Sequence, residues 1–86
     1  MTVRYLVQDT FRIPGRGPVI AGVLQEGEIR NGDVLAVAGT GAQIRISFVE
    51  FHGRETPEGP LIGLVIEPED AAAVTAGSML VSTPET

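Results

Sequence analysis

The stretch FRIPGRGPVIAG, residues 11–22, decides the fold, because it joins two apolar segments through a turn rich in glycine and proline. Alternation of apolar and polar residues predicts a strand from Tyr5 to Ile13. Its apolar face comprises Val7, Phe11 and Ile13, with Asp9 as the exception. The glycines tolerate positive φ and the proline fixes its own φ, so residues 14–17 form a turn. The return strand, Val19 to Gln25, is apolar on both faces, and the stretch therefore predicts a β-hairpin.

The middle of the chain contains a second turn and the longest predicted strand. Asn31-Gly32 is a strong two-residue turn signal, and a strand is expected over residues 33–38. In the next strand Ile44, Ile46 and Phe48 alternate with polar residues, until Val49 breaks the alternation. A one-residue slip in a period of two predicts a β-bulge directly after Phe48.

The last third of the chain is expected to close the fold. A polar loop is predicted over residues 53–59, and Leu61 to Ile66 is an apolar run of the length of a buried strand. One short helical turn is predicted near residues 68–75, because proline and two acidic residues stand where the helix would begin. Met79 to Ser82 then forms the closing strand, and residues 83–86 are expected to be a frayed C-terminal tail.

The composition fits one small β domain over residues 1–86. The chain contains 11 glycines and 6 prolines, which suit short strands and tight turns better than long helices. It contains no cysteine, so disulfides and thiolate chemistry are excluded. No stretch is long and apolar enough for a secretory signal or a membrane span, and a cytoplasmic location is expected.

The charged residues exclude several classes of function. The net charge is −5 and the chain has no lysine, so it offers no basic patch for free DNA or RNA and no P-loop lysine. His52 is the single histidine, and Glu50 lies on the same face two residues before it, as exposed strand pairs often do. Neither a metal site nor a catalytic set is predicted, and no cofactor is expected. The turn around Arg16 resembles an anion cradle only weakly.

A family resemblance extends this interpretation. Residues 11–22 together with residues 27–33, GEIRNGD, resemble the opening of the second domain of elongation factor Tu-type translational GTPases. There a phenylalanine strand meets a Gly-Arg-Gly turn, an apolar strand ends in glycine, and a Gly-x-Ile segment precedes the next glycine. The likeness continues through residues 49–51, 59–63 and 69–80. It implies a small closed six-stranded antiparallel β-barrel, here as a stand-alone chain without the GTPase domain.

The resemblance also implies a pocket with altered residues. In the family, this barrel contacts the switches of the GTPase domain and binds the aminoacylated 3′ end of tRNA. Glu50 matches the glutamate of the tRNA-end pocket, whereas Gly53 and Leu61 stand where the family has arginine and asparagine. Arg54 lies one residue beyond the arginine position. Loss of one such hydrogen bond costs about 1 kcal/mol, so the resemblance implies a reduced pocket.

Three hypotheses about function follow. The leading one is a non-enzymatic binding module, related to translation, that docks on a protein partner through the Arg16 turn or the segment from Glu50 to Arg54. The candidate partner-binding residues are Arg16, Glu50, His52 and Arg54. The alternative is a binder of a tRNA 3′ end or another nucleotide end through the reduced pocket. The third is a subunit that oligomerises through a sheet edge.

Overall fold

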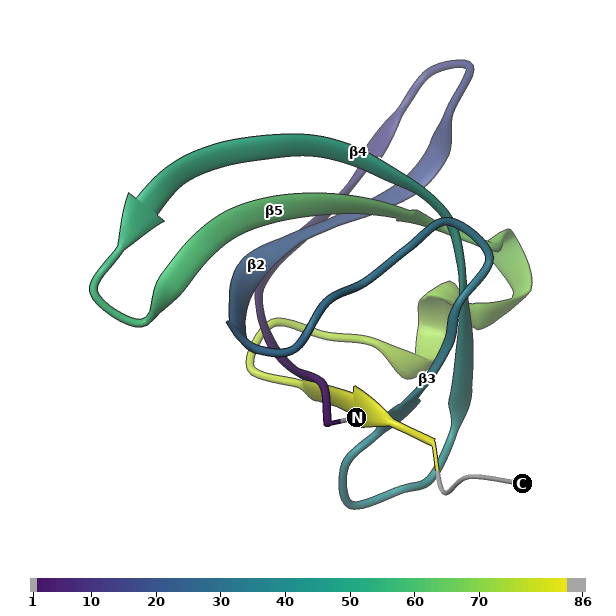
Figure 1. The fold of residues 1–86 in the computed structure, drawn as a ribbon. Coiled ribbons are helices and arrows are strands. Elements are labelled where there is room, and N and C mark those ends of the chain that lie inside the picture. The colour runs from purple at the N-terminus through teal and green to yellow at the C-terminus, as the bar shows by residue number, and fades with distance from the viewer. Residues whose placement is uncertain (1, 84–86) are drawn as a thin grey trace.

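Six antiparallel strands form a closed barrel in the computed structural model, which describes residues 2–83 apart from the side chains of residues 51 and 52 (Figure 1). Around the barrel the order is β1-β2-β5-β4-β3-β6. The elements are β1 (Arg4–Ile13), β2 (Gly17–Glu26), β3 (Val34–Val37), β4 (Gln43–Thr56), β5 (Gly59–Ile66), the 3₁₀ helix η1 (Pro68–Ala73) and β6 (Met79–Ser82). The predicted fold class is confirmed. Only Thr83 of the expected C-terminal tail lies within the described residues.

The ring is uneven. β1, β2, β5 and β4 pair over long stretches, whereas β3 and β6 are short strands that close the gap between β4 and β1. Figure 1 shows β4 and β5 as a long curved pair and the β1–β2 hairpin projecting beyond the ring. The hairpin tip therefore stands out from the barrel body.

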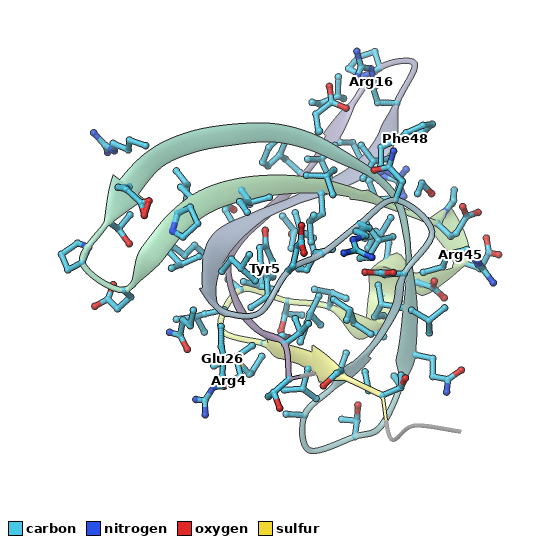
Figure 2. All side chains as sticks on the ribbon, in the orientation of Figure 1. Arg4, Tyr5, Arg16, Glu26, Arg45 and Phe48 are labelled. Atoms are coloured by element: carbon cyan, nitrogen blue, oxygen red, sulfur yellow. The ribbon has the colours of Figure 1, made fainter. Side chains whose placement is uncertain are left out.

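The barrel interior is filled by side chains from all six strands, with Tyr5 among the fully buried ones (Figure 2). The Tyr5 hydroxyl donates a hydrogen bond of 2.5 Å to the carbonyl oxygen of Ile62 and lies 3.4 Å from that of Ile20. A buried phenol needs such a partner. The bond links β1 through the core to β5, which lies on the far side of β2 in the ring.

Burial raises the pKa of the Tyr5 phenol above its ordinary value near 10. The unfolded chain therefore loses this proton first, and stability that is complete below about pH 10 falls as the pH rises further. The chain has one tyrosine, no lysine and no cysteine, so no other such side chain titrates there. We expect Tyr5→Phe to lower stability at pH 7 by about 1 kcal/mol. Urea denaturation at pH 7 and pH 11 should also show that wild-type protein loses stability at the higher pH and that Tyr5→Phe does not. An equal loss of stability in the wild type and the variant would contradict this.

A β-bulge at Gln8 reverses the faces of β1. The pairing of β1 with β2 runs from Val7 opposite Gly22 directly to Asp9 opposite Ala21. Val7 thus faces the core, whereas Phe11 faces outward and is 41% exposed. The prediction that Val7 and Phe11 share one apolar face is therefore wrong. Asp9, the exception in that pattern, marks the position where the phase changes.

A second bulge lies at Ser47, one residue earlier than predicted. The register of β4 against β5 shifts between Ile46 and Phe48, and the Ser47 hydroxyl donates a 2.6 Å hydrogen bond to Glu67. Ile46 is fully buried, Phe48 is 56% exposed, and Val49 packs against the core. The predicted bulge is confirmed, but the placement of Phe48 on the core face is wrong.

The polar loop predicted over residues 53–59 is instead a hairpin. Residues 53–56 continue β4, and the chain reverses at Pro57-Glu58 before β5 begins at Gly59. Another register shift, between His52 and Glu55, accommodates the extra residues in the ladder. Polar composition indicated a loop here because this end of the β4–β5 hairpin extends into solvent.

The remaining turns, strands and helix lie close to where the sequence predicts them. The turn at Asn31-Gly32 is present, with the N–H of Arg30 donating to the Asp33 carboxylate at 2.8 Å. The strand expected over residues 33–38 is the shorter β3, and the helical turn expected near residues 68–75 is η1. Met79–Ser82 forms β6 as predicted.

Candidate docking surface

The structure brings together two of the predicted partner-binding residues. Arg16, at the tip of the β1–β2 hairpin, forms an ion pair with Glu50 of β4. The Arg16 side chain is 52% exposed and that of Glu50 is 22% exposed, so solvent screens the pair. Its main effect is geometric, because it ties the hairpin tip across the outside of the sheet.

A row of apolar residues crosses the same outer face. Phe11 lies opposite Val19, Val19 opposite Val65, and Val65 opposite Phe48, so the row spans β1, β2, β5 and β4. Directly opposed residues of antiparallel strands project from the same face. The two valines lie outside the core cluster and alternate with core residues such as Ile20 and Leu64. The row therefore lies on the outside of the barrel.

The two ends of this row are exposed aromatic rings, although the valines between them are buried. Val19 and Val65 are 0% and 3% exposed, against 41% for Phe11 and 56% for Phe48. Figure 2 shows Phe48 at the hairpin end of the molecule, where Arg16 also lies. We call Phe11, Phe48, Arg16 and Glu50 the docking face.

Sequence reasoning found Arg16 and Glu50 but missed the two phenylalanines. Alternation alone puts each aromatic ring on the core face, because it does not reveal the bulge that lies before the ring. The signal that could have found Phe11 is Asp9, a charged residue in an apolar series. For Phe48 no comparable signal exists, because the sequence pattern fits a bulge before Phe48 as well as one after it.

Leu61 packs against Gly53 at the two substituted positions of the pocket that the resemblance implies. A Cβ added at Gly53 would lie 3.1 Å from the Leu61 carbonyl oxygen and 3.3 Å from the Leu61 Cβ. Leu61 thus leaves little room for a side chain at position 53, where the resemblance implies arginine. Glu50, the matching glutamate, is paired with Arg16. An apolar side chain and an internal ion pair stand where the family has polar groups for a ligand.

Of the remaining two predicted residues, Arg54 lies outside the docking face and the side chain of His52 lies outside the described residues. Arg54 lies further along β4, is exposed, and has no ion-pair partner among residues 2–83. The backbone of His52 pairs with that of Ile62, and its side chain lies outside the described residues. Within the part of the chain that the structure describes, no cluster of three potential metal ligands is found. The described residues also contain no helix long and apolar enough to cross a membrane.

The closed ring and the projecting hairpin define a small antiparallel β-barrel domain, the fold class predicted from the sequence. The chain is 31% identical over 81 residues to elongation factor 1-alpha of Cenarchaeum symbiosum (strain A), which covers 91% of this chain and 19% of that protein. It is 35% identical over 57 residues to elongation factor 1-alpha of Blastobotrys adeninivorans, covering 66% of this chain and 12% of that protein. No family model matches the chain.

These similarities confirm the resemblance to an elongation-factor barrel. The matched length is that of one domain, and the chain spans less than a fifth of either relative. The likeness therefore concerns a domain-sized segment, consistent with the second domain.

Proposed function

We propose that this chain is a non-enzymatic binding module that docks on a protein of the translation machinery through its docking face. The observation that carries the proposal is the pair of exposed rings, Phe11 and Phe48, at the ends of one apolar row. Similarity to elongation factor 1-alpha supports the link to translation.

The docking face has the composition of a protein-binding centre. Aromatic and arginine residues dominate the energetics of protein interfaces, and exposed apolar patches mark such sites. Val19 and Val65 form a rigid base, because they belong to the central strands β2 and β5. The Arg16–Glu50 pair fixes the hairpin tip beside Phe48, so little side-chain freedom remains to be lost on binding.

A partner with positive charge beside an apolar surface would suit this chain. The net charge of −5 attracts a basic surface over a distance of about 10 Å at moderate salt. Tight association would come from burial of the rings, and charge would mainly speed the encounter. Catalysis forms no part of the proposal, since the chain has no lysine for a P-loop and one histidine.

The test is affinity capture from a cytosolic extract of the source cells, followed by quantitative mass spectrometry. We expect wild-type protein to enrich translation proteins, and Phe11→Ala with Phe48→Ala to reduce their capture roughly thirtyfold, as for loss of about 2 kcal/mol at a hot spot. The matched control replaces Glu28 and Arg30 by alanine, which removes an exposed ion pair away from the docking face. Equal capture by all three proteins, or no translation protein with any, would contradict the proposal.

The alternative, binding of a tRNA 3′ end, meets an obstacle in the packing of Leu61 over Gly53. Titration with aminoacylated and uncharged tRNA at two salt concentrations distinguishes the two functions. Phosphate contacts weaken steeply as salt rises. Salt-sensitive binding that requires Glu50 and survives replacement of both phenylalanines would favour the tRNA end instead.

A further inference from the structure

One edge of β1 lacks a strand partner over its second half. β6 pairs with β1 at residues 4–6, and two more backbone hydrogen bonds join Val7 to Gly77 and Ser78, at 2.8 and 2.9 Å. Beyond this point β1 continues to Ile13 paired with β2 alone among the residues that the structure describes. An exposed strand edge of this kind is a template for another extended segment.

The N–H of Thr10 in this region is occupied by a local acceptor. It donates to the Asp9 carboxylate at 2.9 Å, a side-chain bond of the kind that substitutes for a neighbouring strand. Natural strand edges are often protected by charged side chains in this way. Asp9 therefore acts as a weak block on the edge of β1.

A small groove opens beside the same residues. It has a volume of about 150 Å³ and lies between the projecting hairpin, the end of β5 and η1. Its lining residues are Thr10, Phe11, Arg12, Pro18, Val19, Ile20, Ile66 and Ala71. The volume is below the range of drug-sized ligands, about 300–1,000 Å³, and suits a single aliphatic side chain.

Of the residues that the structure describes, Arg12 is the one charged residue that lines the groove, and Asp9 lies beside it on the free edge. Thr10 lies opposite Ile20, a core residue, and Arg12 lies opposite Pro18, so Thr10 and Arg12 share the face that looks into the groove. Arg12 is exposed and has no ion-pair partner within residues 2–83. A bound segment therefore meets an apolar pocket and, two residues along the strand, an arginine.

We propose that the free edge of β1 binds an extended acidic peptide of a partner protein as an additional antiparallel strand. The peptide continues the line in which Gly77 and Ser78 pair with Val7. Its residue opposite Thr10 is aliphatic and enters the groove, and its residue opposite Arg12 is aspartate or glutamate. In an antiparallel strand the acidic residue comes first, so the recognised pattern is acidic, any residue, aliphatic.

This site adjoins the docking face and shares Phe11 with it, because Phe11 also lines the groove. Phe11 and Phe48 project from the outer face of the sheet, whereas Thr10 and Arg12 project from the opposite face of the hairpin. Arg12 belongs only to the groove and Phe48 only to the docking face, so variants of these two residues test the two sites independently.

The test uses a capped seven-residue threonine peptide with glutamate at its third and valine at its fifth position. Binding to the full chain is followed by fluorescence anisotropy and by amide shifts of ¹⁵N-labelled protein. Shifts are expected at residues 9–12 and near Ile66 and Ala71. Arg12→Glu should weaken binding roughly fivefold or more, and a lysine at the third peptide position should restore it to that variant. Arg4→Glu, on the same strand outside the groove, should have no effect.

Asp9 gives a test in the opposite direction. Asp9→Ala removes the acceptor from the Thr10 N–H and should strengthen binding, whereas Asp9→Asn keeps an acceptor and should strengthen it less. A peptide with valine third and glutamate fifth should bind more weakly. Absence of binding by any peptide, equal binding of the two peptide orders, or self-association of the chain through this edge in light scattering would overturn the proposal.

Discussion

Gly22→Ala is expected to destabilise the barrel by about 3 kcal/mol or more, the upper range for overpacking a core. A Cβ at this position would overlap the Leu6 carbonyl oxygen and lie 2.9 Å from Cζ of the Tyr5 ring. Backbone on the neighbouring strand cannot move aside without breaking the β1–β2 ladder, and the ring is held by its bond to Ile62. Small domains are stable by about 5–15 kcal/mol, so the loss is a large fraction of the total.

Gly39→Ala is the matched control for this substitution. Gly39 has a φ of 97°, and a Cβ there would have no heavy atom within 4 Å. It should therefore show the backbone strain of an alanine at positive φ without a clash, about 1 kcal/mol. Gly22 has no positive φ, so its loss would come from the clash alone. Urea denaturation of both variants checks the order, and an equal or smaller loss in Gly22→Ala would contradict the packing described.

Much of the fold follows from local signals in the chain. The turn at residues 14–17, the closing strand Met79–Ser82 and the apolar run of β5 lie where turn chemistry and periodicity predict them. These elements depend on residues close in sequence. The faces of Phe11 and Phe48 do not, because each depends on a bulge, and a bulge is fixed by pairing with a strand elsewhere in the chain.

The candidate site could be predicted only in part for a related reason. Glu50 and Gly53 lie on β4 and Leu61 lies on the adjoining β5, although the sequence predicts Gly53 in a loop. The pairing of Arg16 with Glu50 joins residues 34 positions apart and depends on how the hairpin bends over the sheet. No local sequence pattern predicts how the hairpin bends, so the ion pair can be identified only in the folded structure.

Ile46→Ala and Phe48→Ala are expected to differ by several kcal/mol, although the residues are neighbours in one alternating series. Ile46 is fully buried, and its truncation should cost about 2–5 kcal/mol through lost transfer energy and a cavity. Phe48 is 56% exposed, and its truncation should cost less than about 1 kcal/mol. The difference arises from the bulge at Ser47, which sends the two side chains to opposite faces.

The comparison decides where the strand changes phase. With the bulge after Phe48, as the alternation alone predicts, Phe48→Ala would cost about 3–5 kcal/mol, like other buried aromatic truncations. Urea denaturation of the two variants, with Val49→Ala as a half-buried reference, separates the two positions. A small loss for Phe48→Ala would place its ring outside the core, where binding of a partner protein is the remaining way to bury it. A loss as large as that of Ile46→Ala would remove the ring from the docking face and contradict the proposed function.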